Sequence, residues 1–253
     1  MIEDGKRMPG VDTVEKLATA LSLSKSWLTY GEGPESKEEV LYWVAPGFDG
    51  MQMIEELRSL VAGPGGHIEQ SYKYIDPNDA LSWRALLRQS RYASIIEGMP
   101  LTEISTFILD KAVGRTGLDV IALGAGTAQH ETWIAGRMVD AGYTDLRLFL
   151  LDISQPLLND ACRQAQELLA GAPSIRICAI NGNFHHLQSY ERVFRMPYRR
   201  QRLLTMFGGS FGNLDNEISF LRRSMVGTVP GDLLLLDFQL TRAPSDDPAE
   251  ILK

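Results

Sequence analysis

The sequence predicts an α/β fold, in which a parallel sheet carries helices on both faces and is preceded by all-helical segments. From Gly117 onward, short apolar runs alternate with helical patterns. These runs cover residues 118–123, 146–151, 174–179, 202–207 and 232–238. Continuous apolar runs of this length are typical of buried parallel strands, and their alternation with helices is typical of a sheet covered on both sides. Ligands of such sheets bind outside the carboxyl ends of the strands.

The composition is that of a globular protein. Of 253 residues, 44% are apolar and 23% are charged, which suffices for one large core or two modest ones. The net charge of −7 argues against a broad electrostatic surface for nucleic acid or acidic membrane. Two cysteines cannot build a disulfide framework, and no apolar run resembles a signal peptide or a membrane span. We therefore expect a cytoplasmic protein with no membrane partner.

Residues 1–34 predict a small helical unit. Asp12 and Glu15 mark a helix start, and apolar residues follow at helical spacing. The string DGKRMPGVDTVEKLATALSLSKSWLTYGEGP resembles the second half of a Cro/repressor-type helix-turn-helix domain. In that family the preceding helices hold the base-reading residues, and this sequence starts too late to contain them. We expect a remnant that packs or dimerises, with DNA as a partner only if the parent protein supplies those helices.

Residues 35–114 predict a mostly helical segment. A charged linker, 35–39, separates it from the first unit, and a helix is expected over 47–60. Asp76 and Pro77 form a cap followed by proline at the first helical turn. Pro100 opens another helix, in which Ile104, Phe107, Ile108 and Val113 are spaced to face a core.

A glycine turn follows the first expected strand. Gly124 and Gly126 permit unusual backbone angles and the close approach of a ligand. The helix that begins near Gln129 would offer unpaired N–H donors to that ligand. A dinucleotide fingerprint needs a third glycine where Gln129 stands, which disfavours a nicotinamide or flavin site. The polar Thr127 is more typical of S-adenosylmethionine (SAM) methyltransferases, with an ordinary strand-to-helix turn as the alternative.

Asp152 lies at the end of the second expected strand, 26 residues beyond Gly126. A carboxylate at this place can accept hydrogen bonds from both ribose hydroxyls of an adenosine. The alternative is that Asp152 simply belongs to a helix N-terminus beside Ser154, where acids are favoured. The preceding glycine turn favours the ribose interpretation.

Polar residues also follow the third expected strand. Asn183 could hydrogen-bond the adenine edge and Phe184 could lie against the ring. The alternative is a turn closed by asparagine and glycine. His185 and His186 are adjacent, so their side chains do not face the same way, and no partner stands at ligand spacing. We therefore expect no metal site.

The fourth expected strand leads into FGGSFGN, residues 207–213. Gly208 and Gly209 cluster where the chain must pass close to a bound molecule. Ser210 and Asn213 place neutral polar groups there, which suits methyl transfer because charge is dispersed in its transition state. Taken alone, this stretch is more typical of a structural glycine loop.

The motifs GAGTAQHE, LLDIS, NGNF and FGGSFGN together resemble, in order and spacing, the histidine-specific SAM-dependent methyltransferase family of ergothioneine biosynthesis. The resemblance covers about Tyr72 to Leu240. It implies a Rossmann-like SAM methyltransferase sheet in residues 115–253, and a helical segment in residues 35–114 that covers the substrate.

The resemblance also implies site residues. Those that bind the cofactor would be Gly124, Ala125, Gly126, Thr127, Asp152, Ile153, Gly182, Asn183, Phe184, Gly208, Gly209 and Ser210. Tyr92 and Asn213 would position the nucleophile, and S-adenosylhomocysteine would be the product of the cofactor. The expected reaction is methylation of a small molecule, an amino acid or an amino-acid-like amine. The alternatives are a SAM-responsive transcription regulator and a non-catalytic SAM-binding protein.

Two departures from the family pattern stand out. Asn183 replaces the usual aspartate, although its carbonyl oxygen can still accept a hydrogen bond from adenine. The sequence ends at Lys253, shortly after the fifth expected strand, where the family sheet has two further strands. We therefore expect a sheet truncated after the fifth strand, whose exposed edge makes self-association a hazard and a homodimer a candidate assembly.

Overall fold

The computed structural model describes residues 16, 40–45, 50–63, 72, 75, 77–89, 98–112, 117–172, 175–196 and 199–237. Apart from Lys16, the expected helix-turn-helix remnant lies outside the described residues, and so does Tyr92. Within the described ranges, none of the helices combines the length and the apolar character that crossing a membrane requires.

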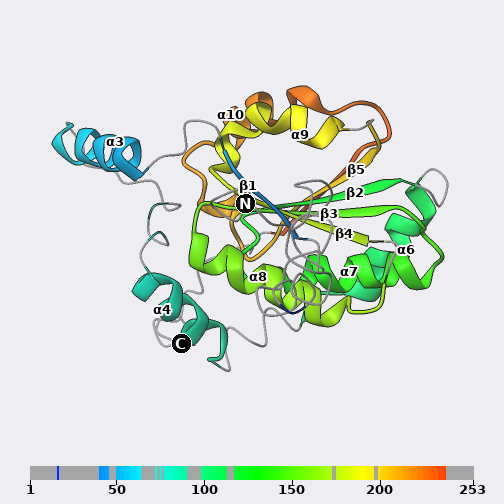
Figure 1. The fold of residues 1–253 in the computed structure, drawn as a ribbon. Helices are drawn as coiled ribbons and strands as arrows, with labels where there is room; N and C mark the ends of the chain where they lie inside the picture. The colour runs from blue at the N-terminus through cyan, green and yellow to red at the C-terminus, as the bar shows by residue number, and fades with distance from the viewer. Residues whose placement is uncertain are drawn as a thin grey trace, which may run out of the picture.

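A six-stranded parallel sheet forms the centre of the molecule (Figure 1). The strands lie in the order β1-β4-β3-β2-β5-β6, and every neighbouring pair is parallel, as predicted. Their bounds are β1 Val40–Val44, β2 Leu118–Leu123, β3 Leu146–Asp152, β4 Ile175–Asn181, β5 Gln201–Met206 and β6 Leu233–Leu236. The five strands expected from the apolar runs are confirmed to within two residues at each end.

Strand β1 was not predicted, because residues 35–114 were expected to be mostly helical. Val40–Val44 pairs with β4 in register from Val40 opposite Ile177 to Val44 opposite Asn181. Its valines and aromatic residues favour an extended backbone. The continuous apolar run VLYWV was the available signal, but a short apolar run does not by itself distinguish a strand from a helical segment. The edges of the sheet are therefore β1 and β6.

The helices largely follow the predicted pattern. They are α3 Gly50–Ala62, α4 Pro77–Leu87, α6 Leu101–Lys111, α7 Gln129–Asp140, α8 Gln155–Leu168, α9 Glu191–Arg195 and α10 Glu217–Ser224, with 3₁₀ turns η2 Phe184–Tyr190, η3 Phe211–Asn213 and η4 Met225–Gly227. Ser154 caps α8 by accepting a hydrogen bond from the Leu157 N–H at 3.5 Å. The expectation that Phe107 faces a core was wrong. Ile108 is buried and Ile104 packs against the same cluster, as predicted, whereas Phe107 is exposed beside the Lys111 ammonium. Val113 lies outside the described residues.

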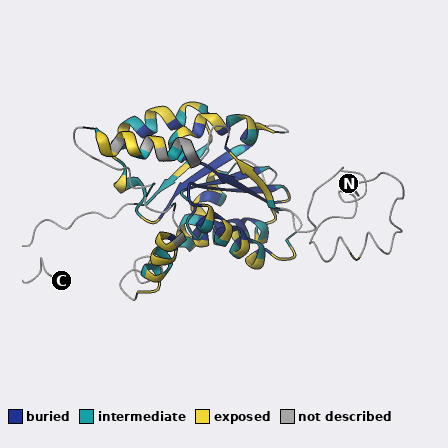
Figure 2. Cartoon of the chain, turned by 60° about the vertical axis from the view of Figure 1, so that its left-hand side comes forward, coloured by how far each residue is buried: buried dark blue, intermediate teal, exposed yellow. Residues whose placement is uncertain are grey.

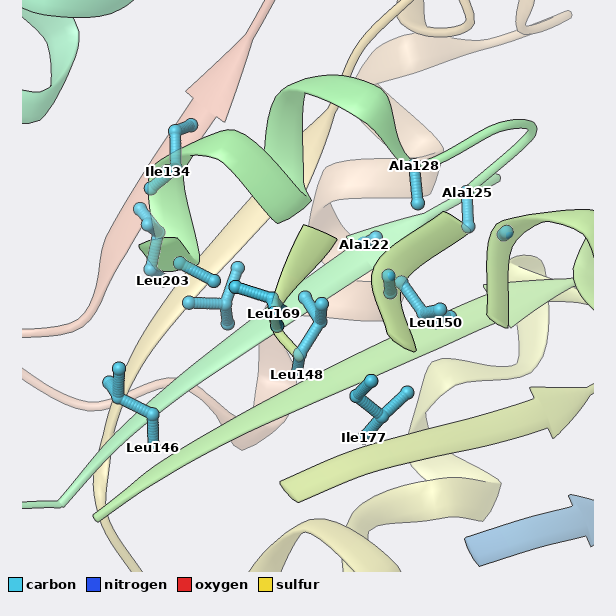
Figure 3. Close-up of a cluster of buried hydrophobic side chains, with 14 of the residues drawn as sticks. Ala122, Ala125, Ala128, Ile134, Leu146, Leu148, Leu150, Leu169, Ile177 and Leu203 are labelled. Carbon is cyan, nitrogen blue, oxygen red and sulfur yellow. The ribbon is translucent and has the colours of Figure 1, made fainter. Parts of the chain in front are cut away.

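Helices cover both faces of the sheet. In Figure 1, α6, α7 and α8 lie on one side, and α9 and α10 lie on the other. Successive strand residues point to opposite layers, so Ala122 packs toward α7 and α8 whereas Ile121 packs toward η2 and α9. Figure 3 shows the first of these clusters. The central strands β2 and β3 are buried along their whole length, and the outer faces of the helices are exposed (Figure 2).

Ion pairs gather where the strands begin, and we call this side of the sheet the amino edge. Arg147 on β3 donates two hydrogen bonds to the Asp119 carboxylate on β2, at 2.7 and 2.5 Å, and both residues are buried. Arg200 pairs with Asp145 at 2.5 Å. Arg202 on β5 donates to both carboxylate oxygens of Glu191, at 2.6 and 3.1 Å. Buried arginines at this edge are thus paired with carboxylates.

Candidate functional site

The strand order creates a switch point between β2 and β5. From β2 the chain moves outward through β3 and β4, and it then returns to β5 on the other side of β2. In open α/β sheets, ligands bind in the crevice outside the carboxyl ends of the strands at such a point. The glycine turn after β2 and the glycine turn after β5 flank it. We call this side of the sheet the carboxyl edge.

The first turn is anchored to the neighbouring strand. The N–H groups of Gly124 and Ala125 both donate to the Leu151 carbonyl of β3, at 2.9 and 3.0 Å. Gly124 and Gly126 have φ of +71° and +53°, in the left-handed region that favours glycine. Ala128, at the start of α7, also has φ of +53°, which is strained for a residue with a Cβ. The turn after β2 therefore has an unusual backbone conformation, and hydrogen bonds to β3 hold it in place.

Asp152 faces this turn, as predicted from the strand end. Its Oδ2 accepts the Gly126 N–H and its Oδ1 accepts the Ser154 N–H, both at 2.8 Å. Burial raises the pKa of Asp152 to about 6, although the N–H donors stabilise its charged form. A carboxylate offers about four lone-pair sites. The two N–H bonds leave each oxygen with acceptor capacity for a hydroxyl.

The end of β4 is tied to the end of β3. The Asn181 side chain donates to the carbonyls of Asp152 and Ile153, at 3.1 Å each, and the Gly182 N–H also donates to the Asp152 carbonyl, at 3.0 Å. A Cβ built on Gly182 would lie only 2.5 Å from the Tyr190 hydroxyl oxygen. Glycine at position 182 therefore allows Tyr190 to pack directly against the backbone. The sequence prediction missed Asn181, whose position as the last residue of a strand was its available signal.

Asn183 and Phe184 follow at the same strand end. The Asn183 Oδ1 accepts the His185 N–H at 2.9 Å and so caps η2, which is the turn alternative raised from the sequence. The predicted acceptor for adenine, Oδ1, is therefore already engaged by one N–H group, and the contact of Asn183 with adenine stays a prediction. Phe184 stacks on His185 with ring centroids 4.8 Å apart, and it packs edge-on against Phe220.

The glycine turn after β5, which is the second turn, lies close to the glycine turn after β2. Ser210 and Phe184 lie close to the first turn, because a Cβ built on Gly124 would be 3.3 Å from Phe184 Cε1 and 3.8 Å from Ser210 Oγ. Ser210 Oγ donates to the Phe207 carbonyl at 3.1 Å. Asn213 is exposed on η3, and its N–H donates to the Ser210 carbonyl at 3.3 Å. Motifs from the ends of β2, β4 and β5 thus meet at Gly124.

Trp83 was not predicted as a site residue. It belongs to α4. An ion pair between the Arg84 guanidinium of α4 and the Asp160 carboxylate of α8, 2.9 Å apart, links the two helices. A Cβ built on Gly126 would lie 3.8 Å from the Trp83 indole nitrogen. The helical segment before the sheet therefore reaches the first glycine turn.

Glu131 and Asp237 were also missed. Glu131 lies in the first turn of α7, is buried and accepts the Thr205 hydroxyl at 3.2 Å. Burial raises its pKa to about 7, and the charge of Asp237 adds to this effect. Asp237 follows β6 and accepts the N–H groups of Gly208 and Gly209. The sequence held no signal for either role, since an acid in a first helical turn or after a strand is ordinary.

Metal binding has no support in the part of the chain that the structure describes. There, no group of three or more histidine, cysteine, aspartate or glutamate side chains could hold an ion.

The fold is that of a Rossmann-like α/β protein, in which the predicted motifs meet at the switch point of the sheet. Residues 89–246 match the family described as histidine-specific methyltransferase, SAM-dependent, and the chain belongs to this family. It is a SAM-dependent methyltransferase, and its cofactor is SAM. The match favours an enzyme over a transcription regulator. A search of curated proteins finds no match to the sequence.

Proposed function

We propose that this methyltransferase acts on a nitrogen of a small amino acid or amino-acid-like amine, at the carboxyl edge of the sheet. The proposal rests on one observation, which is that residues at the carboxyl ends of β2, β3, β4 and β5 lie close together. Phe184 and Ser210 lie against the Gly124 turn, and Asp152 is hydrogen-bonded to Gly126. Separate motifs of the sequence thereby line one place, at the point where a parallel sheet binds its ligand.

The residues present fit the adenosine part of SAM. The Asp152 carboxylate retains acceptor capacity for the two ribose hydroxyls. The left-handed backbone at Gly124 and Gly126 lets a ligand approach the bare main chain at the start of α7, where N–H groups point outward. We assign Asn183 and Phe184 to adenine, with the Asn183 amide as donor and the Phe184 ring as packing surface.

SAM supplies a methyl group on a sulfonium, and the protein supplies position. Ser210 and Asn213 present neutral polar groups, which suit a reaction that disperses charge. Holding the reacting atoms in line contributes on the order of 7–11 kcal/mol to lowering the barrier, so a strong general base is not needed. We assign Asn213 and Tyr92 to positioning on the acceptor side. We add Ser210, which the family resemblance placed with the cofactor together with Gly208 and Gly209, because Asp237 takes both N–H groups of that glycine turn.

Two features support the acceptor class. The Asp237 carboxylate lies behind the second turn, which favours a basic nitrogen compound over an acidic one. The description of the matching family specifies histidine, which makes L-histidine the first acceptor to test. The approach of Trp83 to the first turn supports the helical part of residues 35–114 as the segment that covers the site, whereas Val40–Val44 in that range belongs to the sheet.

The test begins with cofactor binding. Calorimetry with SAM and with S-adenosylhomocysteine should show binding to the unaltered chain. Asp152→Ala should weaken it by about 1.5–3 kcal/mol, or roughly 10- to 150-fold, because two charge-assisted hydrogen bonds to ribose are lost. Asp145→Asn, at the amino edge, is the control and should bind as the unaltered chain does. Equal binding by Asp152→Ala would contradict the cofactor site.

The second step is methyl transfer from isotopically labelled SAM. L-histidine should gain labelled methyl groups, detected by mass spectrometry, whereas an acidic amino acid such as L-glutamate should not. Binding of SAM without labelling of histidine or any other free amino acid or small amine would refute the proposed acceptor class and leave the cofactor assignment intact.

A further inference from the structure

Asp237 connects β6 to the glycine turn of residues 207–213, a segment that we call the acceptor loop. Met206 and Leu236 end β5 and β6 opposite each other. The Asp237 N–H extends this pairing by donating to the Met206 carbonyl at 3.2 Å. The backbone of Asp237 is thus held beside the point where β5 gives way to the turn at Gly208.

The Asp237 carboxylate receives both N–H groups of that turn. Gly208 donates to Oδ2 at 2.9 Å, and Gly209 donates to Oδ1 at 2.8 Å. Both glycines have positive φ, +77° and +73°. Consecutive N–H groups in such a conformation form an anion-binding nest, and here the anion is a side chain of the protein itself.

The need for glycine at these two positions is conformational. A Cβ built on Gly208 or on Gly209 would find no atom within 4 Å, so close packing does not hold the turn in place. A glycine pair loses much conformational freedom when it is ordered. The described contacts that oppose this loss are the two charge-assisted hydrogen bonds to Asp237 and the neutral bond from the Ser210 hydroxyl to the Phe207 carbonyl, of which the charge-assisted bonds are the stronger kind.

The conformation of the turn determines where the residues that follow it lie. Ser210 comes directly after Gly209 and lies near the Gly124 turn, and Asn213 is hydrogen-bonded to the Ser210 carbonyl. We propose that Asp237 is a positioning residue for methyl transfer, which holds the acceptor loop in place through the Gly208 and Gly209 N–H groups. This role rests on the proposed function of Ser210 and Asn213.

Asp237→Asn is the informative variant, because the amide keeps the size of the side chain but replaces one acceptor oxygen with an N–H₂ group. Asp232→Asn is its matched control. Asp232 precedes β6 at the amino edge and accepts the backbone N–H groups of Arg202 and Val229, both at 3.0 Å, and it also pairs with Arg199 at 2.5 Å. Each variant thus removes one carboxylate that holds backbone, at opposite ends of the same strand.

Hydrogen exchange of individual amides, measured by NMR, tests the contact itself. In Asp237→Asn, the Gly208 and Gly209 amides should exchange at least about tenfold faster, because a hydrogen bond to a charged group is lost. In Asp232→Asn they should exchange as in the unaltered protein. Equal exchange at these glycines in the unaltered protein and in Asp237→Asn would overturn the proposal.

Kinetics then test positioning. With L-histidine and a panel of free amino acids and small amines as acceptors, Asp237→Asn should lower kcat/KM for the acceptor about 10- to 100-fold. The Kd for SAM should change less than about twofold. Asp232→Asn should leave both unchanged, even if its thermal midpoint falls further. Faster glycine exchange with unchanged kcat/KM would refute a positioning role.

The two proposals fail in different ways. If no acceptor of the panel is methylated by the unaltered protein, the proposed function fails and the positioning role fails with it, whatever the exchange rates are. If the unaltered protein methylates an acceptor and Asp237→Asn does so equally well, only the role of Asp237 is lost.

Discussion

The two edges of the sheet handle buried charge in opposite ways. At the amino edge, Asp119 is met by the guanidinium of Arg147, so charge neutralises charge. At the carboxyl edge, Asp152 and Asp237 are met by backbone N–H groups of glycine turns. Each of these carboxylates accepts two hydrogen bonds, but only the guanidinium cancels the negative charge, whereas neutral N–H donors leave it in place. The amino edge is therefore electrostatically neutralised, and the carboxyl edge keeps negative charge beside the two glycine turns.

The largest expected effect on stability comes from removing an ion pair at the amino edge. Asp119→Ala should destabilise the protein by about 3–5 kcal/mol, because Arg147 is left as a buried charge without its partner. Urea denaturation measures the loss. Replacing both residues, by Asp119→Leu with Arg147→Met, should cost less than Asp119→Ala alone. A double variant that is less stable than Asp119→Ala would contradict this account.

The next effect concerns the carboxyl edge and depends on pH. Burial raises the pKa of Glu131 from 4.5 to about 7. The contribution of Glu131 to stability is therefore fully present below pH 4.5 and is lost as the pH rises through 7. At 1.36 kcal/mol per pKa unit, the total loss is about 3 kcal/mol.

Glu131→Gln should gain stability relative to the unaltered protein between pH 4.5 and about 7, and then keep a constant difference. Denaturation by urea at pH 4.5, 6 and 8 measures this. Glu103→Gln on α6, an exposed position, is the control and should show no such trend. A stability difference for Glu131→Gln that does not vary with pH would show that Glu131 is not held neutral by burial.

Packing at the carboxyl edge gives a smaller effect. Gly182→Ala should cost about 1–3 kcal/mol, because its Cβ would lie 2.5 Å from the hydroxyl of Tyr190, which is buried and hydrogen-bonded to the Asn183 carbonyl. Thermal unfolding measures the change. Gly136→Ala in α7 is the matched control and should be stabilising by about 0.5–1 kcal/mol, since its Cβ meets only an ordinary contact at 3.7 Å. The same sign for both variants would contradict the packing argument.

The smallest effect concerns a helix cap. Ser154→Ala should destabilise by about 1 kcal/mol through loss of the cap of α8. Asn216→Ala, which removes the cap of α10, should cost a similar amount. Because the Ser154 N–H that donates to Asp152 is a backbone group, SAM binding should survive Ser154→Ala. Strong loss of SAM affinity would mean that the hydroxyl itself belongs to the site.

Much of the fold could be predicted, because its signals are local. The apolar runs from 118 to 238 and the cap at Ser154 each depend on a few adjacent residues, and the structure confirms them. The orientation of Asp152 toward the Gly126 turn followed from the rule that parallel strands end at one edge. The contacts of Asn183 with adenine and of Tyr92 with the acceptor stay predictions.

The sequence by itself determined most of the parallel sheet, its helices and the edge at which the glycine turns and Asp152 gather, since these depend on periodicity and turn chemistry within short windows. Only the tertiary structure decided that Val40–Val44 joins β4, that Trp83 reaches the Gly126 turn and that Asp237 holds Gly208 and Gly209. Those partners lie far apart in the chain, and nothing in a short stretch of sequence records which distant group will satisfy a free strand edge or an open pair of N–H groups.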